Sequence, residues 1–178
     1  QENGDGSYTL KPDANYNGQL NLNYDVSDGT ETVSTSANID VAAVNDAVVA
    51  GDIDLGSTQE DSSITFSAED LLAKASDVDG DTISLVEVSV AQEFGSVTDN
   101  QDGTYTFNPA ENFHGQDVPL QFSVTDGQTV DSATATLDIT SVNDGPETGE
   151  ALSFSTDEDQ AIVITEEQLL AKASDIDG

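Results

Sequence analysis

Residues 71–80 read LLAKASDVDG and residues 169–178 read LLAKASDIDG, so almost the same decapeptide occurs twice, 98 positions apart. Two shorter motifs keep nearly this spacing, namely VND at 44–46 and 142–144, offset by 98, and DGSYT at 5–9 with DGTYT at 102–106, offset by 97. A fixed period is the sequence signature of tandem repeats. A period near a hundred residues is the size of one small domain, so we expect a series of similar domains.

The period divides the chain into one complete repeat and two partial ones. Residues 47–144 form the complete repeat, residues 1–46 the C-terminal half of a preceding one, and residues 145–178 the N-terminal part of the next. Neither flank holds enough strands to close a sandwich alone. Three explanations stay open for the flanks: neighbouring chains complete them, they continue into a longer array, or they fray.

The chain is strongly acidic, with 36 aspartate and glutamate residues against three lysines, a formal net charge of −33. A nucleic acid partner needs a cationic footprint for its phosphates, so this composition excludes nucleic acid binding. It also argues against anionic membrane surfaces, and no stretch approaches the ~20 apolar residues that insert across a bilayer. Such acidity is typical of disordered chains as well, but recurring two-residue alternation favours a folded protein.

The chain has no cysteine, so disulfides cannot hold its domains together. Small extracellular domains with a thin core usually need a disulfide or a metal ion. A metal ion is therefore expected to stabilise these domains. The lack of cysteine and methionine, with abundant aspartate, serine, threonine and glycine, suits a secreted bacterial surface protein.

Alternating apolar residues predict about seven short strands in the complete repeat, which is typical of a β-sandwich. The strand near residues 83–90 changes phase between Leu85 and Val86, as a bulge or bend would produce. An odd number of antiparallel strands leaves the two termini at opposite poles, as a linear array requires. The other strands are expected near residues 48–55, 63–66, 95–98, 105–107, 120–124 and 133–139.

One short helix is expected before the Asp-rich loop, over residues 67–75. Ser67 is the expected N-cap, and its first turn is acidic. The matching segment carries a full capping box, Thr165 followed three residues later by Gln168. Two turns of helix are not stable alone, so Leu71 and Leu72 are expected to dock on the sandwich.

The loop after this helix is the strongest candidate site. Asp77, Asp79 and Asp81 alternate around Gly80, and Asp175 and Asp177 repeat the pattern. Carboxylates that converge in this way repel one another unless a cation lies between them. Hard oxygen donors suit Ca²⁺, and Mg²⁺ less well, because Mg²⁺ prefers small octahedral sites that keep several waters. An ordinary acidic turn is the alternative, and the glycine position rules out an EF-hand loop.

Two further acidic motifs recur at the same period. Asn45 and Asp46 end one repeat, as Asn143 and Asp144 end the next, and both residue types turn the chain and offer oxygen atoms. Glu60 and Asp61, repeated at 158–159, precede a strand near a pole of the domain. A lone acidic pair is usually solvent-exposed surface, but its recurrence beside the other two motifs favours metal binding.

Together these motifs resemble the cadherin-like tandem repeats of large bacterial surface proteins, including RTX-type adhesins that are exported by type I secretion. The resemblance is carried by VND, the ED pair, LLAKASDVDGD, and DGTYTFNPAENFHG with FSVTDG, and it covers essentially the whole chain. It implies Ig-like, Greek-key β-sandwich repeats. It also implies Ca²⁺ between successive domains, held by the end of one domain, the linker and the Asp-x-Asp loop of the next.

The resemblance implies a ligand set for each junction. Asp28 and Asp126 are weaker candidates, because such residues are more often simple turn residues. The chain lacks the five-residue linker and the Asp-Arg-Glu motif of animal cadherins, so it does not fix the number of ions. The first junction would use Asn45, Asp46, Asp77, Asp79 and Asp81, and the second Glu60, Asp61, Asn143, Asp144, Asp175 and Asp177.

An enzyme is not expected. His114, the only histidine, is interpreted as a surface loop residue, since Asn17 holds its place in the preceding repeat. Paired aspartates could serve a glycosidase, but these lie in loops at domain poles rather than across a groove.

The function expected is that of a structural extender. Ca²⁺ would stiffen each junction, adjacent repeats of the same polypeptide would be the main partners, and the array would hold a distal binding domain away from a bacterial cell, as in biofilm adhesion. Two alternatives stay open: a module that binds carbohydrate or like chains on another cell, and a subunit of a self-assembling extracellular fibre or surface layer.

Overall fold

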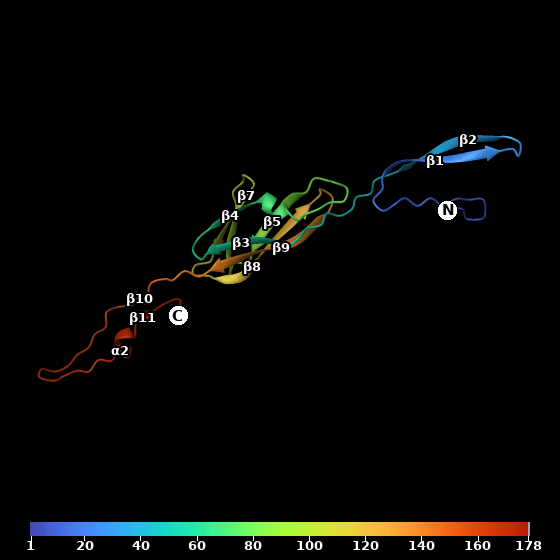
Figure 1. Cartoon of the computed structure of the whole chain (residues 1–178). Helices are drawn as coiled ribbons and strands as arrows, with labels where there is room; N and C mark the ends of the chain where they lie inside the picture. The colour runs from blue at the N-terminus through green and yellow to red at the C-terminus, as the bar shows by residue number, and fades with distance from the viewer. Residues whose placement is uncertain (178) are drawn as a thin grey trace. The chain divides into compact units, whose positions relative to one another are not determined.

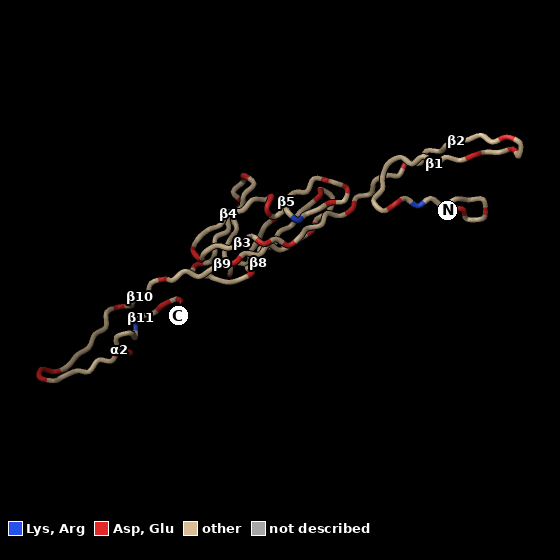
Figure 2. The backbone as a smooth tube through the Cα atoms, viewed as in Figure 1, with Lys and Arg blue, Asp and Glu red and all other residues tan. Residues whose placement is uncertain are grey.

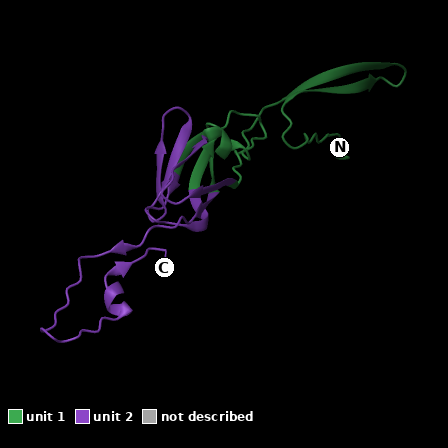
Figure 3. Cartoon of the chain, turned by 60° about the vertical axis from the view of Figure 1, so that its left-hand side comes forward, with its two compact units in different colours: residues 1–53, 68–88, 121–135 green, residues 54–67, 89–120, 136–178 purple. Residues whose placement is uncertain are grey.

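The computed structural model describes residues 1–177 and consists mainly of β-strands (Figure 1). Gly178, which ends the second decapeptide, lies outside the described residues. The chain forms two compact units, coloured separately in Figure 3: one contains residues 1–53, 68–88 and 121–135, the other residues 54–67, 89–120 and 136–178. Each unit contains one flank and part of residues 47–144, so the repeat boundaries stay a prediction.

The elements follow one another in a simple order along the chain. They are β1 (Gly18–Ser27), β2 (Thr32–Val41), β3 (Ile53–Gln59), β4 (Ile64–Ser67), α1 (Ala68–Leu72), β5 (Ser84–Val90), β6 (Gly95–Asp99), β7 (Thr104–Pro109), β8 (Gly115–Thr125), β9 (Val130–Thr140), β10 (Glu147–Thr148), α2 (Glu166–Leu170) and β11 (Ala173–Ser174).

Residues 47–144 contain seven strands, β3 to β9, which confirms the number predicted from alternation. They form a four-stranded sheet in the order β3-β9-β8-β5 and a three-stranded sheet in the order β4-β7-β6. β3 lies beside β9, and β5 beside β8, although neither pair is consecutive in sequence, so connections cross over as in a Greek key. The predicted all-β sandwich class is therefore confirmed.

The hydrophobic core follows the alternation of the strands. Inward positions of β8 and β9 supply most of it, and Phe66 on β4 and Phe107 on β7 add aromatic side chains from the other sheet. The Phe66 ring stacks on Tyr105, with 6.1 Å between ring centroids. The buried side chains of β8 and β9 are Val118, Leu120, Phe122, Val124, Ala135, Leu137 and Ile139.

Two strands differ from the simple pattern. The first strand of the repeat begins at Ile53 rather than near Val48, because the preceding segment bridges Val49 to Ser76 instead. The phase change predicted after Leu85 is present: Leu85 and Val88 are half-buried, and Val86 between them is exposed.

A bulge interrupts β8 at Asp117. Equivalent positions are 97 apart at Gly18 and Gly115 but 98 apart at Asp28 and Asp126, so β8 has gained one residue. Asp117 adopts a positive φ of 52°, and its amide donates to the Asp138 carboxylate at 2.9 Å. A one-residue bulge absorbs the insertion and leaves the later inward positions of β8 in register with those of β1.

The helices are shorter than predicted. α1 covers Ala68–Leu72, whereas Ser67 ends β4 and Ala73 and Lys74 form a turn. The chain leaves the helix early because Ser76 has to reach Val49. Leu71 is fully buried as expected, and Leu72 is half-buried. The capping box predicted for α2 is confirmed, with Thr165 and Gln168 bonding reciprocally.

The flanks form only small sheets. β1 and β2 make an antiparallel hairpin paired from Gly18 with Val41 to Ser27 with Thr32. β10 and β11 pair through two residues each. Within residues 1–177, both are two-stranded sheets, so the expectation that neither flank closes a sandwich alone agrees with the structure.

Candidate metal centres

The Asp77–Asp81 loop gathers three carboxylates within the first unit. Ser76 is held against Val49 by two backbone hydrogen bonds of 2.8 and 2.9 Å, which fix where the loop begins. Asp77 Oδ1 then accepts from the amides of Asp79 at 2.9 Å and Asp81 at 3.2 Å. Gly80 permits this tight turn with a φ of 78°. As a result, one oxygen from each of the three aspartates lies within 4.8 Å of the others.

The linker bonds to this loop. The Asp46 amide donates to Asp79 Oδ2 at 2.7 Å, so the loop carboxylate clamps the backbone of the linker. The Asn45 side chain donates to the Asp46 carbonyl at 2.7 Å and to Asp126 Oδ2 at 3.1 Å, and its Oδ1 accepts from Gln128. These contacts hold the backbone of Asp46 against the loop.

Asp126 is a turn residue that also orients the linker. It accepts hydrogen bonds from the hydroxyl and amide of Thr129, from the Gln128 amide and from Asn45. The Thr129 hydroxyl, followed by the Thr129 amide, holds the pKa of Asp126 well below its usual range. Its equivalent Asp28 accepts from the amides of Thr30 and Glu31, both at 2.8 Å. The structure therefore gives both residues the turn role that sequence analysis favoured.

One oxygen of the first cluster has no partner. Asp77 Oδ2 is buried and accepts no hydrogen bond from the residues that the structure describes. Leaving a buried carboxylate oxygen unpaired is costly, so such atoms usually bind a donor or a cation. Because Asp77 converges with Asp79 and Asp81, a bound cation is a fitting partner for this atom.

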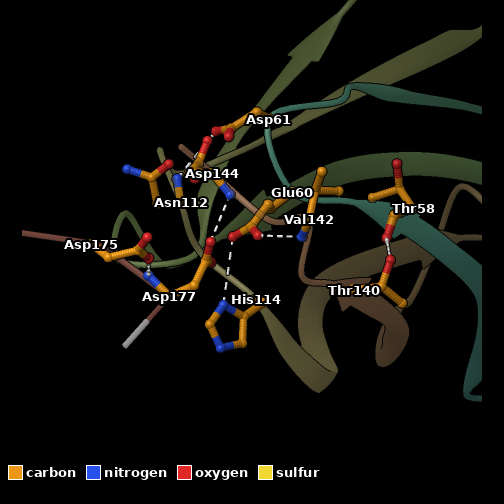
Figure 4. A network of polar contacts seen from close by, with 10 residues as sticks. All are labelled: Thr58, Glu60, Asp61, Asn112, His114, Thr140, Val142, Asp144, Asp175 and Asp177. Atoms are coloured by element: carbon orange, nitrogen blue, oxygen red, sulfur yellow. Dashed lines mark hydrogen bonds and ion pairs between the residues drawn. The ribbon is translucent and has the colours of Figure 1, made fainter. Parts of the chain in front are cut away.

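The second cluster, within the second unit, repeats the hydrogen bonds between the linker and the Asp-rich loop. The Asp144 amide donates to Asp177 Oδ2 at 2.6 Å, the Asn143 side chain to the Asp144 carbonyl at 2.6 Å, and the Asp177 amide to Asp175 Oδ1 at 3.0 Å. Figure 4 shows Asp144, Asp175 and Asp177 beside Glu60. Oxygens of Glu60, Asp144 and Asp177 lie within 4.8 Å of one another.

Glu60 is a buried acid, with 3% of its surface exposed. It follows β3, and its amide donates to the Thr140 carbonyl at 2.9 Å at the end of β9. Its Oε1 accepts from the Val142 amide at 2.6 Å, and its Oε2 lies 3.5 Å from Nδ1 of His114. Because these partners hold the buried carboxylate of Glu60 in place, its oxygen atoms have a fixed position in the cluster.

The surroundings of Asp144 disfavour its charged form. Desolvation raises the pKa of Asp144, and repulsion from Asp177, Asp61, Glu60 and Asp175 raises it further. Its Oδ2 is buried and, among residues 1–177, accepts no hydrogen bond. A cation at this point would relieve both the repulsion and the missing contact.

Asp61 lies at the edge of the second cluster. It adopts a positive φ of 57°, and its Oδ1 accepts from the Asn112 amide at 3.1 Å (Figure 4). Asn112, Asp144 and Asp175 also line one cavity of about 610 Å³. The structure thus adds Asn112 to the set, whereas sequence analysis considered this loop only through His114, as a surface residue. The sequence carried a signal for this residue, because Asn15 stands at the equivalent position of the preceding repeat. In the structure, Asn15 and Asn17 line a cavity together with Asp46 and Asp79.

The structure brings the predicted residues together in two groups. Asn45 and Asn143 approach through side-chain amides that bond to the linker carbonyl. His114 is in a loop with 57% of its side chain exposed, yet it contacts Glu60, which its interpretation as an ordinary surface residue did not include. Carboxylate oxygens converge for Asp77, Asp79 and Asp81 in the first group and for Glu60, Asp144 and Asp177 in the second. Asp46 joins the first group through its backbone amide, Asp175 joins the second by accepting from the Asp177 amide, and Asp61 lies close enough to raise the pKa of Asp144.

Two of the three lysines have partners outside the clusters. Acidic residues occur along the whole chain in Figure 2, whereas the lysines are isolated. Lys74 donates to the Asp52 carbonyl at 2.7 Å, and Lys172 lies 3.9 Å from Glu150. Their ammonium groups are therefore engaged away from the converging carboxylates.

The family model for the cadherin-like domain matches residues 1–42, 44–140 and 142–178. The chain belongs to the cadherin-like domain family. Membership of this family indicates that these repeats are structural or adhesive modules. Cadherin-like domains generally bind Ca²⁺ and are typically extracellular. No helix among residues 1–177 is long and apolar enough to cross a membrane.

Among solved structures, the cadherin-like chain is similar to two endo-fucoidan hydrolases of glycoside hydrolase family 107. MfFcnA4 is 15% identical, with a TM-score of 0.37, and the match covers 74% of this chain and 20% of that one. MfFcnA9 is 13% identical, with a TM-score of 0.33, and covers 71% and 23%. The chain thus spans about a fifth of the length of these structures. No curated protein matches the chain.

The two clusters fit the metal of this family. Both consist of oxygen donors, both contain a buried carboxylate oxygen without a hydrogen-bond partner in the described chain, and neither includes cysteine. Such hard donor sets suit Ca²⁺ rather than a softer transition metal.

Proposed function

We propose that the chain consists of Ca²⁺-rigidified extender repeats from a long bacterial cell-surface adhesin, where it holds a distal binding domain away from the cell. The proposal rests on a hydrogen bond between the linker backbone and an aspartate of the loop, which occurs in both clusters. Asp46 N to Asp79 Oδ2 is 2.7 Å, and Asp144 N to Asp177 Oδ2 is 2.6 Å. Because the repeat conserves this contact, the geometry of the joint is specified as closely as that of the sandwich.

Named residues would hold the ion at each joint. Asp46, Asp77, Asp79 and Asp81 would hold it at the first, and Glu60, Asp61, Asp144, Asp175 and Asp177 at the second. The ion would supply positive charge that neutralises these carboxylates and ties the linker to the loop. Asn45 and Asn143 would orient the linker through their bonds to the carbonyls of Asp46 and Asp144.

In this proposal the calcium concentration controls the stiffness of the array. Extracellular calcium modules bind with Kd values of roughly 10⁻⁴–10⁻³ M, so millimolar calcium outside a cell would keep the joints closed. At lower calcium, repulsion within each cluster would loosen the linkers. The main partners in this proposal are adjacent repeats of the same polypeptide, and no catalytic reaction is assigned to the chain.

Small-angle scattering and thermal unfolding of the full chain test this proposal, each with calcium and with EDTA. Calcium is expected to raise the melting temperature and to narrow the distribution of interatomic distances, because each bound ion removes freedom from a linker. Isothermal calorimetry should report binding at both clusters.

Two variants sharpen the experiment. Asp77→Asn removes a charge from the first cluster and should reduce the calcium response. Glu87→Gln removes the same charge from an exposed position on β5 and should leave the response intact. A melting temperature and scattering profile that ignore calcium in the parent chain would refute the proposal.

A further inference from the structure

Residues 45–52, which begin in the linker, are bonded on both of their sides. On one side, Val49 and Ser76 exchange two backbone hydrogen bonds at the start of the Asp-rich loop. On the other side, the amides of Val48 and Ala50 donate to side chains of the connection between β8 and β9 and of β9 itself. These acceptors are Thr129 Oγ1 at 3.2 Å and Asp131 Oδ2 at 2.8 Å. The segment therefore ties the loop of the first cluster to the end of the sandwich where β8 meets β9.

The side chain of Asn45 has partners at both ends of its amide. Its Nδ2 donates to the Asp46 carbonyl at 2.7 Å and to Asp126 Oδ2 at 3.1 Å, which engages both of its hydrogens. Its Oδ1 accepts from Gln128 Nε2. Asn45 is half-buried, so these contacts are partly shielded from water. The amide therefore has a fixed orientation, and it holds the Asp46 carbonyl in place.

The turn that holds Asn45, residues 126–129, is built in the same way elsewhere in the chain. Asp28, the counterpart of Asp126 in the preceding repeat, accepts from the amides two and three residues after it, as Asp126 does. Asp28 makes these bonds without an asparagine partner among residues 1–177. The turn thus needs no contact with a linker in order to form, and it offers Asn45 a fixed carboxylate.

A series of contacts leads from this turn to the first cluster. Asp126 and Gln128 hold the Asn45 side chain. That side chain holds the Asp46 carbonyl, and the Asp46 amide donates to Asp79 Oδ2 at 2.7 Å. Neither residue of the turn belongs to the group of converging carboxylates. The hydrogen bonds of the turn therefore reach the cluster through the linker.

We propose that the 126–129 turn is a positioning element of the first cation site, in which Asp126 and Gln128 raise the affinity without binding the ion. They hold Asn45, which keeps the Asp46 backbone against the loop. In this role Asn45 is a connector rather than an ion ligand. Replacing residues that orient metal ligands from behind typically costs 10–100-fold in metal affinity. The inference rests on the proposed function, because it concerns a calcium site that the function requires.

Terbium, a luminescent substitute for Ca²⁺, gives a readout of the first cluster in the full chain. Tyr16 lines the cavity that Asp46 and Asp79 also line, whereas the described residues that line the cavity at the second cluster include no tyrosine. Emission excited through tyrosine should therefore report the first cluster, and Tyr16→Phe should reduce it strongly. Displacement of terbium by calcium then gives the calcium affinity in each variant, and isothermal calorimetry gives it independently.

Gln128→Ala tests the turn without changing any charge. It removes a donor to Asn45 at an exposed position, so the melting temperature in EDTA should stay close to that of the parent chain. The calcium affinity of the first cluster is expected to fall by about fivefold, the equivalent of about 1 kcal/mol. Gln121→Ala is the matched control, since Gln121 is also exposed but donates to Thr134 on β9. An unchanged affinity in Gln128→Ala, or an equal loss in the control, would overturn the proposal.

A double-mutant cycle between Asn45 and Asp126 separates positioning from the general attraction of a negative charge for the ion. Asp126→Asn alone should lower the affinity by about tenfold, because one end of the new side chain donates instead of accepting. In the Asn45→Ala background the same substitution should have little further effect, since the contact is already lost. Equal losses in both backgrounds would indicate charge attraction alone and refute the positioning role. Asp28→Asn removes the same charge from the counterpart turn and should leave the affinity unchanged.

The positioning role and the extender function fail in different ways. A parent chain that binds calcium at the first cluster, with turn variants that bind equally well, would refute the positioning role and leave the extender function standing. A parent chain that binds neither terbium nor calcium at this cluster would refute both. Full affinity in the parent chain, with non-additive losses in the cycle, is the expected result.

Discussion

The carboxylates of the two clusters have different partners, and this difference determines what each one does. Asp79 is the clearest case, because its Oδ2 accepts the Asp46 amide and so connects the loop to the linker. Asp177 makes the same bond to Asp144. A hydrogen bond to an ionised carboxylate is about twice as strong as a neutral one. These residues therefore position the linker as well as offering oxygen atoms to an ion.

Asp79→Asn should weaken calcium binding at the first cluster by about tenfold or more, because both a ligand charge and the linker clamp are altered. Isothermal calorimetry of the full chain would measure this loss. The second cluster should keep its affinity. The control is Asp102→Asn, which changes an aspartate in the turn before β7 that bonds to Thr104. An equal loss in the control would contradict the role given to Asp79.

Asp144→Asn should have opposite effects with and without calcium. The pKa of Asp144 is raised by desolvation and by neighbouring acids, so its charged form destabilises the ion-free fold. That destabilisation is absent below the pKa of the unfolded chain, develops as the pH rises, and is complete above the raised folded pKa. At neutral pH the variant should therefore melt higher than the parent in EDTA.

In calcium, the same Asp144→Asn variant should melt lower than the parent, because the second cluster has lost a charged donor. Differential scanning calorimetry in EDTA and in millimolar calcium would show both shifts. The EDTA difference should shrink at acidic pH, where the parent carboxylate is protonated. A variant that melts lower under both conditions would indicate a purely structural Asp144.

At the scale of elements, two-residue alternation was sufficient to predict the seven strands, because apolar side chains on strands such as β8 and β9 face one core. It did not predict the bulge at Asp117, although the change of repeat offset from 97 to 98 marks the insertion. The helix was predicted too long, since propensity favours Ala73–Ala75 but pairing of Ser76 with Val49 ends it at Leu72.

The candidate sites show the same division. The residue types and spacing of Asp77, Asp79 and Asp81 were enough to predict convergence, because alternate positions around a glycine turn to one side. The roles of Asn112 and His114 could not be predicted in this way. Both reach the Glu60 and Asp61 positions from a loop distant in sequence, and only tertiary packing brings them together.

Gly95→Ala should destabilise the complete repeat by about 3 kcal/mol, through overpacking and backbone strain. A Cβ at Gly95 would lie 2.1 Å from the Asn108 carbonyl oxygen, and its φ is 141°. Urea unfolding would measure the change. Gly103→Ala is the matched control, since its φ is also positive but no atom lies within 4 Å of the new Cβ. Equal losses would indicate that β6–β7 packing is looser than described.

At the scale of the whole molecule, charge is the dominant feature that folding has to accommodate. The chain carries a net charge of −33, and Figure 2 shows acidic residues distributed along its length. Two of its three lysines bond away from the clusters, Lys74 to the Asp52 carbonyl and Lys172 near Glu150. Self-repulsion of this size destabilises a compact state, so stability should depend on whatever screens or neutralises the carboxylates.

The melting temperature in EDTA should therefore rise substantially as sodium chloride is increased from about 10 mM to about 1 M, because the Debye length falls from about 30 Å to about 3 Å. Much less calcium should give the same stabilisation, since an ion held between converging carboxylates neutralises them directly, whereas sodium only screens them.

Magnesium at equal ionic strength is the control. It should act like sodium if the clusters prefer the larger ion, because it gives up its water shell reluctantly. Differential scanning calorimetry across these conditions would decide the matter. A chain stabilised equally by calcium and magnesium at every concentration would indicate general screening rather than ion binding at the two clusters.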